Sequence, residues 1–218
     1  RKFECSSVFF GFGSENPRVL EFMNKQMAPE ELRKGLDAAG RYPDIKVFAQ
    51  IIIGIPTHTW EEMIATVRYL VDMLETRSNF FGYISPYQPL PGSTFFYLAK
   101  EKGFRGYETI DDFNLIGNKF KQKGFFRYEW LDLPGSKKER IRRGFALSDY
   151  FMKTLFIRRN FGGIVGLLNR PFYAVARYRM RNLRPGFLVE AHLYNLAVRV
   201  YEYLVKKGLC RLPGNFRS

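Results

Sequence analysis

The sequence contains only two cysteines, Cys5 and Cys210, among its 218 residues. Two cysteines cannot build a disulfide framework, and they cannot supply a cysteine-rich metal site within this chain. No apolar run approaches the roughly 20 residues that a membrane-spanning helix requires, and no signal segment follows Arg1. We therefore expect a chain that works in a reducing, cytoplasmic setting, either free in solution or bound to a surface.

Acidic residues are scarce in the last third of the chain. Residues 137–218 contain 18 lysines and arginines but 4 acidic residues, whereas residues 1–136 contain 17 of each kind. The whole formal charge of +14 therefore lies in the last 82 residues. This asymmetry predicts two zones, a neutral part and a basic region that faces an anionic partner.

Three short apolar runs each break into a segment rich in glycine and proline. They read VFFGFGSENP from Val8, VFAQIIIGIPTHT from Val47 and FFGYISPYQPLPGST from Phe80. Continuous apolar runs of this length are typical of parallel strands that are buried on both faces. Because ligands bind at the carboxyl ends of such strands, the sequence places the candidate site in these three segments.

Helical patterns follow each run. Pro29 opens a helix that Gly40 ends, and Thr59 with Glu62 forms a capping-box pattern before a helix to about Leu74. The apolar stripe of that second helix consists of Met63, Val67, Leu70 and Leu74. A shorter helix is expected to end at Gly103. The order β-α-β-α-β-α predicts a segment of a barrel or of an open sheet.

The remainder of the chain is predicted to be irregular and then helical. Residues 107–134 show no regular pattern. Ser136 and Glu139 form a capping-box pattern that predicts one long basic helix to about Arg158, and further helices are expected near 163–181 and 187–206.

The three segments, taken in order, resemble the later half of the radical S-adenosylmethionine barrel. They are most similar to the branch that often carries a cobalamin-binding domain in front, and the resemblance covers about residues 3–104. It implies an α/β fold, namely the C-terminal part of a partial (β/α) TIM barrel followed by a basic, mostly α-helical region. The implied regions are a half-barrel over 1–104, an irregular connection over 105–135 and the basic helices over 136–218.

The resemblance also implies site residues. Gly11, Phe12 and Ser14 match the family's Gly-x-Glu-Ser-Gly turn, which lies against the ribose and methionine parts of the cofactor. Gly13 replaces the family's glutamate, and only a rebuilt turn would let Glu15 restore that charge-assisted contact. The second strand end implies an apolar platform for adenine. The residues that the resemblance places at the cofactor are Gly11, Phe12, Ser14, Glu15, Gln50, Ile52, Gly54, Pro56, Tyr87 and Gln88.

Members of this family cleave S-adenosylmethionine reductively at a 4Fe-4S cluster held by three cysteines of a CxxxCxxC loop. That loop is absent here and normally precedes the segments seen in this chain, so we expect a fragment whose cluster ligands lie outside it. The implied cofactors are S-adenosylmethionine, the 4Fe-4S cluster and, in this branch, cobalamin. No residue of this chain is assigned as catalytic or as a metal ligand.

The resemblance implies part of a radical enzyme that acts on a small or lipid-like substrate, by methyl transfer through cobalamin or by other radical chemistry. Two alternatives stay open. A degenerate, non-catalytic barrel could serve as a membrane or partner scaffold, which Gly13 and His58 favour. A protein that modifies or binds transfer RNA would suit the charge of +14, but such relatives usually end in a small β-barrel, so nucleic acid is the less favoured partner.

The basic region carries an amphipathic pattern over residues 161–181. The apolar residues that share a face are Ile164, Leu167, Leu168, Phe172, Val175 and Tyr178. This pattern suits a helix in an anionic membrane interface at the inner, cytoplasmic face, and it equally suits a helix packed on the barrel with a solvated arginine side. Pro171 is expected to bend or divide the helix.

Three smaller expectations complete the interpretation. His58 stands next to a helix start, where a solvent-facing histidine is more common than a proton donor. Cys5 is expected to be a small buried residue rather than a cluster ligand. A barrel without its opening strands leaves unpaired sheet edges, so we expect poor solubility of the chain in isolation.

Overall fold

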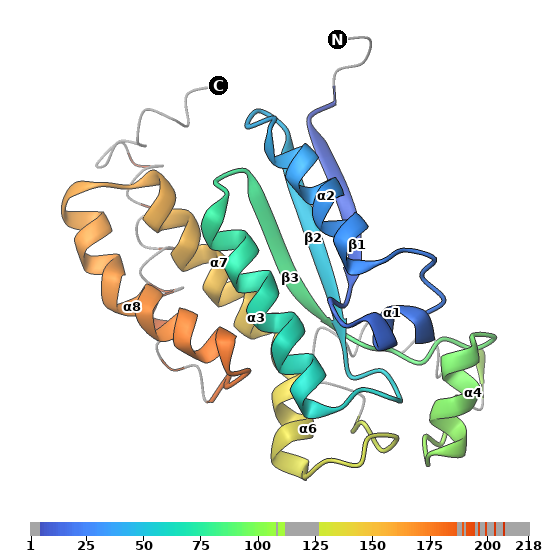
Figure 1. Ribbon diagram of the computed structural model, residues 1–218. Helices are drawn as coiled ribbons and strands as arrows, with labels where there is room; N and C mark the ends of the chain where they lie inside the picture. Colours follow the sequence, from blue (N-terminus) through green and yellow to red (C-terminus); the bar gives the residue numbers. More distant parts are fainter. Residues whose placement is uncertain are drawn as a thin grey trace.

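The protein is built around a three-stranded parallel sheet in the order β1-β2-β3 (Figure 1). The computed structural model describes residues 5–107, 109–111, 127–186, 189, 191–194, 196, 199, 203 and 207. The strands are β1 (Ser7–Gly13), β2 (Lys46–Ile53) and β3 (Phe80–Pro86). The predicted α/β class and the three predicted strands are confirmed.

The two crossover helices, α2 (Pro29–Gly40) and α3 (Trp60–Thr76), lie on one face of this sheet. The short helix α1 (Pro17–Phe22) follows β1, and α4 (Thr94–Glu101) follows β3. Figure 1 shows α2 and α3 side by side in front of the strands. The order of strands therefore follows the order of the chain, and the two crossover helices share a face.

The predicted stripe of α3 forms the core against the sheet. Its members are fully buried, namely Met63, Val67, Leu70 and Leu74. Every second residue of β2 points toward these helices and is buried as well. A Cβ on Gly82 of β3 would lie 2.8 Å from the Ala49 carbonyl oxygen and 2.9 Å from Leu70 Cδ1. Glycine at this position therefore lets α3 approach the sheet closely.

The outer edge of β3 is covered by a helix. The basic region contains α6 (Gly135–Arg142), α7 (Gly144–Asn160) and α8 (Gly163–Arg181). The Ile84 backbone N–H of β3 donates to Ser148 Oγ of α7 at 3.2 Å. The Arg159 guanidinium donates to the Phe80 carbonyl oxygen at 2.8 Å. Side chains of α7 thus take the place of a fourth strand, whereas within the described residues no strand pairs with the outer edge of β1.

The prediction of one long helix from Ser136 to about Arg158 is wrong. The chain forms two helices that meet at Arg143, and α6 begins after Pro134 without a side-chain cap. Glu139 pairs with Arg142 instead, with 2.7 Å between Oε2 and Nε. A Cβ on Gly144 would lie 3.0 Å from Ile84 Cγ2, so the break falls where glycine lets α7 reach the sheet.

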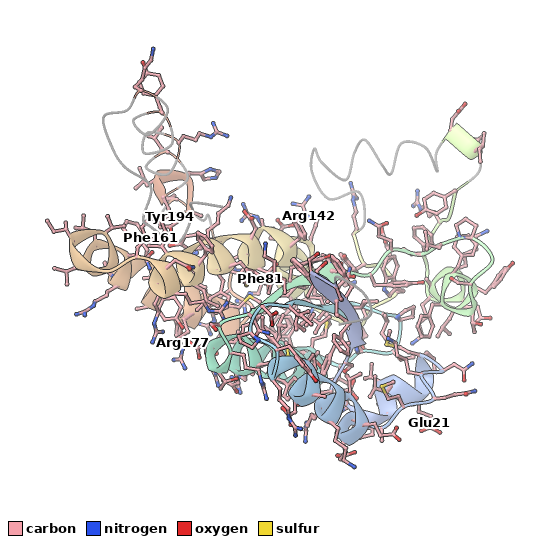
Figure 2. The ribbon with its side chains drawn as sticks, turned by 90° about the horizontal axis from the view of Figure 1, so that it is seen from above. Glu21, Phe81, Arg142, Phe161, Arg177 and Tyr194 are labelled. Atoms are coloured by element: carbon pink, nitrogen blue, oxygen red, sulfur yellow. The ribbon has the colours of Figure 1, made fainter. Side chains whose placement is uncertain are left out.

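The predicted helix over 163–181 is confirmed as α8, which passes through Pro171 as one helix. One hydrophobic core runs from Phe12 of β1 to Tyr194 of the C-terminal region, so sheet and basic helices pack together. In Figure 2, Arg177 of α8 lies to the left of the sheet and Glu21 of α1 to its right. The expectation of a buried Cys5 is wrong, because this residue precedes β1 and is exposed.

Candidate functional site

The face of the sheet turned away from α2 and α3 carries the candidate site. We call this surface the open face, and its residues are Phe9, Gly11, Phe48, Gln50, Ile52, Phe81, Tyr83 and Ser85. On β2 and β3 these residues are half-buried, whereas their neighbours on the helix side are fully or nearly fully buried. The parallel register sets them in rows, with Gly11, Gln50 and Tyr83 in one row.

An aromatic row closes the amino-terminal end of the open face. The rings of Phe9 and Phe48 stack with 4.6 Å between centroids, and those of Phe48 and Phe81 stack at 5.3 Å. Register requires this contact, because the three residues are direct partners across the sheet. The three rings make this part of the open face apolar. A polar ligand on the open face is therefore expected nearer the carboxyl ends of the strands.

Polar groups occupy the open face beyond the aromatic row. Gln50 Nε2 donates to Ser85 Oγ on the neighbouring strand. The ammonium of Lys25, which follows α1, donates to the Gly11 carbonyl oxygen. Partial burial lowers the pKa of this lysine below its ordinary value. A cation, an amide and a hydroxyl therefore lie along the same end of the sheet.

The turn after β1 directs its polar side chains away from the open face. Ser14 is fully buried, and its hydroxyl lies 2.9 Å from Thr66 Oγ1 of α3. Phe12 is buried on the helix side, where its ring stacks on Tyr69. The Glu15 carboxylate pairs with Arg33 of α2, with 3.3 Å between Oε2 and Nη2. Glu15 therefore does not stand in for the carboxylate that Gly13 replaces.

The turn after β2 is closed by residues from the connecting segment. Gly54 has a φ of +84°, and its carbonyl oxygen accepts from Trp130 Nε1 at 2.7 Å. A Cβ on Gly54 would lie 2.8 Å from Tyr128 Cε1. Pro56 is buried in the same turn. The backbone that the resemblance assigns to adenine is thus already covered by two aromatic rings, and glycine is required by both conformation and space.

The expectation of a solvent-facing His58 is wrong. This side chain is 5% exposed, and its Nδ1 accepts from the Gly54 N–H at 3.2 Å. Burial lowers its pKa to about 4, so the imidazole is neutral at pH 7 and its proton resides on Nε2. The helix start predicted at Thr59 is confirmed, but the loop before it folds inward and carries the histidine with it.

A small pocket lies beside this turn. Its volume is about 310 Å³, and it is lined by Thr57, His58, Trp60, Trp130 and Lys137 among others. Thr57 Oγ1 and His58 Nε2 are buried and make no hydrogen bond with the part of the chain that the structure describes. The pocket thus offers a hydroxyl and an imidazole N–H to a ligand group.

An ion pair ties the turns after β1 and β2 together. Arg18 Nε lies 2.7 Å from Glu62 Oε1, and Arg18 Nη2 donates to the Thr57 carbonyl oxygen at 2.9 Å. The hydrogen bond from Arg18 lowers the pKa of the Glu62 carboxyl to about 2. Glu62 also completes the predicted capping box with Thr59. Its first role is therefore structural, as the sequence indicated.

The turn after β3 lies next to the end of β2. The Tyr87 N–H donates to the Ile53 carbonyl oxygen at 2.7 Å, which extends the pairing of β2 and β3. Its ring meets Trp130 edge-on with 6.0 Å between centroids. Burial raises the pKa of the Tyr87 phenol to about 12. Gln88 is half-buried in the same turn.

The structure brings some predicted residues together and separates others. Gly11, Gln50 and Ile52 share the open face, whereas Phe12 and Ser14 are buried away from it. The site residues that sequence reasoning missed are Lys25, Tyr83 and Ser85. Tyr83 and Ser85 could have been predicted from the alternation of side chains along β3, since residues two apart in a strand lie on the same face. The position of Lys25 had no such signal.

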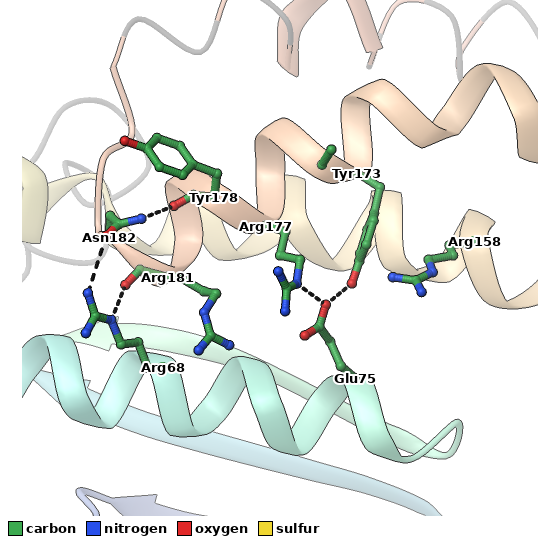
Figure 3. Close-up of a pocket in the computed structure, with 9 residues that line it drawn as sticks. Arg68, Glu75, Arg158, Tyr173, Arg177, Tyr178, Arg181 and Asn182 are labelled. Carbon is green, nitrogen blue, oxygen red and sulfur yellow. Dashed lines mark hydrogen bonds and ion pairs between the residues drawn. The ribbon is translucent and has the colours of Figure 1, made fainter.

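A second, larger hollow lies on the helix side, between α3 and α8 (Figure 3). It has a volume of about 750 Å³ and is lined by Arg68, Glu75, Arg158, Tyr173, Ala174, Arg177, Tyr178, Arg181 and Asn182. We call it the arginine groove. No grouping of three histidine, cysteine, aspartate or glutamate residues suited to a metal ion occurs among the residues described. Within the same residues, every helix is too short or too polar to cross a bilayer.

The chain is similar to a methyltransferase. It is 30% identical over 113 residues to an uncharacterized methyltransferase of Pyrococcus horikoshii. The match covers 49% of this chain and 24% of that protein, so the aligned part spans about a quarter of the relative's length. No family model matches the chain.

Proposed function

We propose that this chain is the later part of a β/α barrel that binds S-adenosylmethionine, within an enzyme of the radical S-adenosylmethionine type. The observation that carries the proposal is the convergence of the three predicted segments on one edge of a single parallel sheet. Strands in chain order with both crossover helices on one face suit a barrel, because a doubly wound sheet has helices on both faces.

The open face carries side chains whose charge and polarity match the chemical groups of S-adenosylmethionine. The Lys25 ammonium at Gly11 offers a cation for the carboxylate of the methionine part. Gln50 and Ser85 offer polar groups for hydroxyls, and Ile52 with Tyr83 offers apolar surface for the adenine ring. A Cβ on Gly11 would meet only the Lys25 ammonium, at 3.5 Å, so a ligand can approach the strand there.

When bound, S-adenosylmethionine would supply a methyl group or, after reductive cleavage, the radical that abstracts hydrogen from the substrate. In this proposal Lys25 holds the carboxylate, the Gln50 and Ser85 pair orients the ribose, and the aromatic row of Phe9, Phe48 and Phe81 borders the site at the amino-terminal end of the sheet. The relative named as a methyltransferase supports methyl transfer as the reaction class. The described residues do not suit a 4Fe-4S cluster, so we place its ligands, and any cobalamin site, outside this chain.

One observation favours a second candidate, a barrel that has lost catalysis and acts as a scaffold. Gly13 stands where the family has a glutamate, and Glu15 is turned toward Arg33 rather than toward the open face. A barrel that lacks this carboxylate loses one partner for the cofactor's ammonium group. Binding of S-adenosylmethionine distinguishes the two candidates.

Equilibrium dialysis of the full chain against labelled S-adenosylmethionine tests the proposal. Lys25→Met removes the cation and is expected to weaken binding about tenfold, as for loss of a charge-assisted hydrogen bond. The matched control is Lys34→Met, because Lys34 is an exposed lysine of α2. Equal affinity of both variants contradicts the role proposed for Lys25, whereas no binding by the unaltered chain contradicts the proposed function and favours the scaffold.

A further inference from the structure

Helix α8 has two opposite apolar faces. Its inner face packs on α7 and α3 and contains the buried residues Asn169, Tyr173, Ala176 and Met180. At 100° per residue the opposite side of the helix carries Ile164, Leu167, Leu168, Pro171, Val175 and Tyr178. We call this second set the outer stripe.

The outer stripe is exposed along its whole length. Ile164 is 76% exposed, Leu168 is 64% exposed and Tyr178 is 57% exposed. An apolar surface of this extent on a soluble protein marks an interaction site, because isolated apolar residues are common but contiguous ones are not. A helix that is apolar on two opposite faces is normally covered on both. Helices α3 and α7 cover the inner face of α8, whereas the outer stripe is left exposed.

The arginine groove adjoins the outer stripe. Figure 3 shows Arg158, Arg177 and Arg181 directed into the space between α8 and α3. Arg177 Nε pairs with Glu75 Oε1 at 2.6 Å, and Arg181 pairs with Asp72. The Arg158 guanidinium lies 4.3 Å from the centroid of the Tyr173 ring.

Charge in the groove is positive on balance. Four arginines line it, since Arg68 joins the three named above, against the carboxylates of Glu75 and Asp72. Planar guanidinium groups bind phosphate through paired hydrogen bonds, so the groove suits a phosphate group. Tyr178 belongs to both surfaces, because it lines the groove and ends the outer stripe.

The apolar stripe of α8 and the cationic groove beside it match the two parts of a phospholipid. Apolar side chains enter the boundary between headgroups and acyl chains, while arginines bind the phosphates beside them. The excess of 14 positive charges over residues 137–218 favours an anionic surface over a neutral protein partner. Because no described helix can cross a bilayer, the contact is with its surface.

We propose that α8 docks the protein on an anionic phospholipid bilayer, with the outer stripe in the headgroup boundary and a lipid phosphate in the arginine groove. This inference is independent of S-adenosylmethionine binding, since it uses residues on the helix side of the sheet. It would bring the protein to substrates that reside in the membrane.

Co-sedimentation of the full chain with vesicles tests the inference. We expect binding to vesicles of phosphatidylcholine with 30% phosphatidylglycerol (about a third anionic lipid), weakened by salt, and little binding to phosphatidylcholine alone. Leu167→Glu combined with Leu168→Glu is expected to lower the partition coefficient at least tenfold. The control is Leu90→Glu, which places a carboxylate on an apolar residue that is 50% exposed outside the stripe.

Arg158→Glu tests the groove, because this arginine has no ion pair among the described residues. Its charge reversal is expected to lower partition about fivefold or more, whereas Lys34→Glu on α2 leaves only the small effect of net charge. Circular dichroism melts confirm that each variant is folded before it is compared.

Several outcomes overturn the inference. One is the absence of binding to anionic vesicles at low salt, and another is binding that the stripe variant leaves unchanged. Dimerisation that Leu167→Glu with Leu168→Glu abolishes, in ultracentrifugation without lipid, assigns the stripe to a second copy of the chain. Binding of inorganic phosphate or RNA without vesicle binding assigns the groove to a soluble anion.

Discussion

Helices α3 and α8 use their apolar residues in opposite ways. The apolar stripe that the sequence shows in α3 is the face that packs on the sheet, and its members are fully buried. The apolar stripe that the sequence shows in α8 is mostly exposed, and the helix packs through another face that includes Asn169 and Tyr173. A helix that packs on one side needs one apolar stripe, so the second stripe of α8 is the surface that the proposed contact with a bilayer would cover.

The comparison predicts that adding a side chain carbon lowers stability more in the turn after β2 than at the start of α8. Gly54 and Gly163 both have positive φ, +84° and +58°, but only Gly54 has side chains within 4 Å of the position of a Cβ. Gly54→Ala adds a steric clash with Tyr128 to backbone strain, so we expect a loss of about 3 to 4 kcal/mol of unfolding free energy. Gly163→Ala is expected to cost about 1 kcal/mol from strain alone.

Chemical denaturation of both glycine variants measures this difference. The unchanged chain provides the reference, and equal m-values confirm that the same surface unfolds. Equal losses for Gly54→Ala and Gly163→Ala would mean that Tyr128 does not pack on the turn after β2.

The second prediction compares one leucine from each stripe. Leu70→Ala in α3 removes a fully buried side chain and is expected to cost about 3 kcal/mol, whereas Leu168→Ala in α8 is expected to change stability by less than about 0.5 kcal/mol. Thermal melts without lipid measure both. A large loss for Leu168→Ala would show that another part of the chain already covers the outer stripe.

Local patterns predicted most of the sheet and its helices. The apolar runs fixed the three strands, and the spacing of Met63, Val67 and Leu70 fixed the buried face of α3, because both signals arise from neighbours in the sequence. The resemblance placed Gly11, Gln50 and Ile52 at the cofactor, and the alternation of side chains along the strands sets all three on the open face.

Tertiary contacts determined what the sequence could not predict. The break at Arg143 depends on the approach of Gly144 to Ile84, and the burial of His58 depends on its hydrogen bond to Gly54. Lys25 reaches Gly11 only because the chain reverses after α1, where Asn24 has a φ of +51°. The contacts of Gly144 and Lys25 join residues far apart in the sequence, and the contact of His58 with Gly54 is local but lies in a turn, where no helical or strand period applies.

The third prediction uses the two histidines, one near the sheet and one in the basic region. Burial lowers the pKa of His58 from 6.5 to about 4, so the unfolded chain takes up a proton between these values that the folded chain does not. Stability is therefore complete above pH 6.5 and falls as pH decreases to about 4, by about 3 kcal/mol in total.

His58→Asn is expected to flatten this part of the stability profile, although it lowers stability at pH 7. The control variant is His192→Asn, which changes an exposed histidine of the C-terminal region. Urea titrations at half-unit steps between pH 7 and pH 4 separate the two variants. The burial of His58 would be refuted by a profile that keeps its slope in His58→Asn.

The smallest predicted effect compares two ion pairs. Arg18 and Glu62 join the turns at the sheet end, and the Glu62 side chain is 13% exposed, whereas Glu139 in its pair with Arg142 is 44% exposed. Glu62→Gln keeps the capping geometry but removes the charge, so we expect a loss of about 1 kcal/mol, against about 0.3 kcal/mol for Glu139→Gln. Because Arg18 lowers the pKa of Glu62 to about 2, its contribution is present above about pH 4.5 and disappears as pH falls toward 2. Equal losses of unfolding free energy for both variants at pH 7 would contradict this prediction. They would mean that the lower exposure of Glu62 does not strengthen its ion pair relative to that of Glu139.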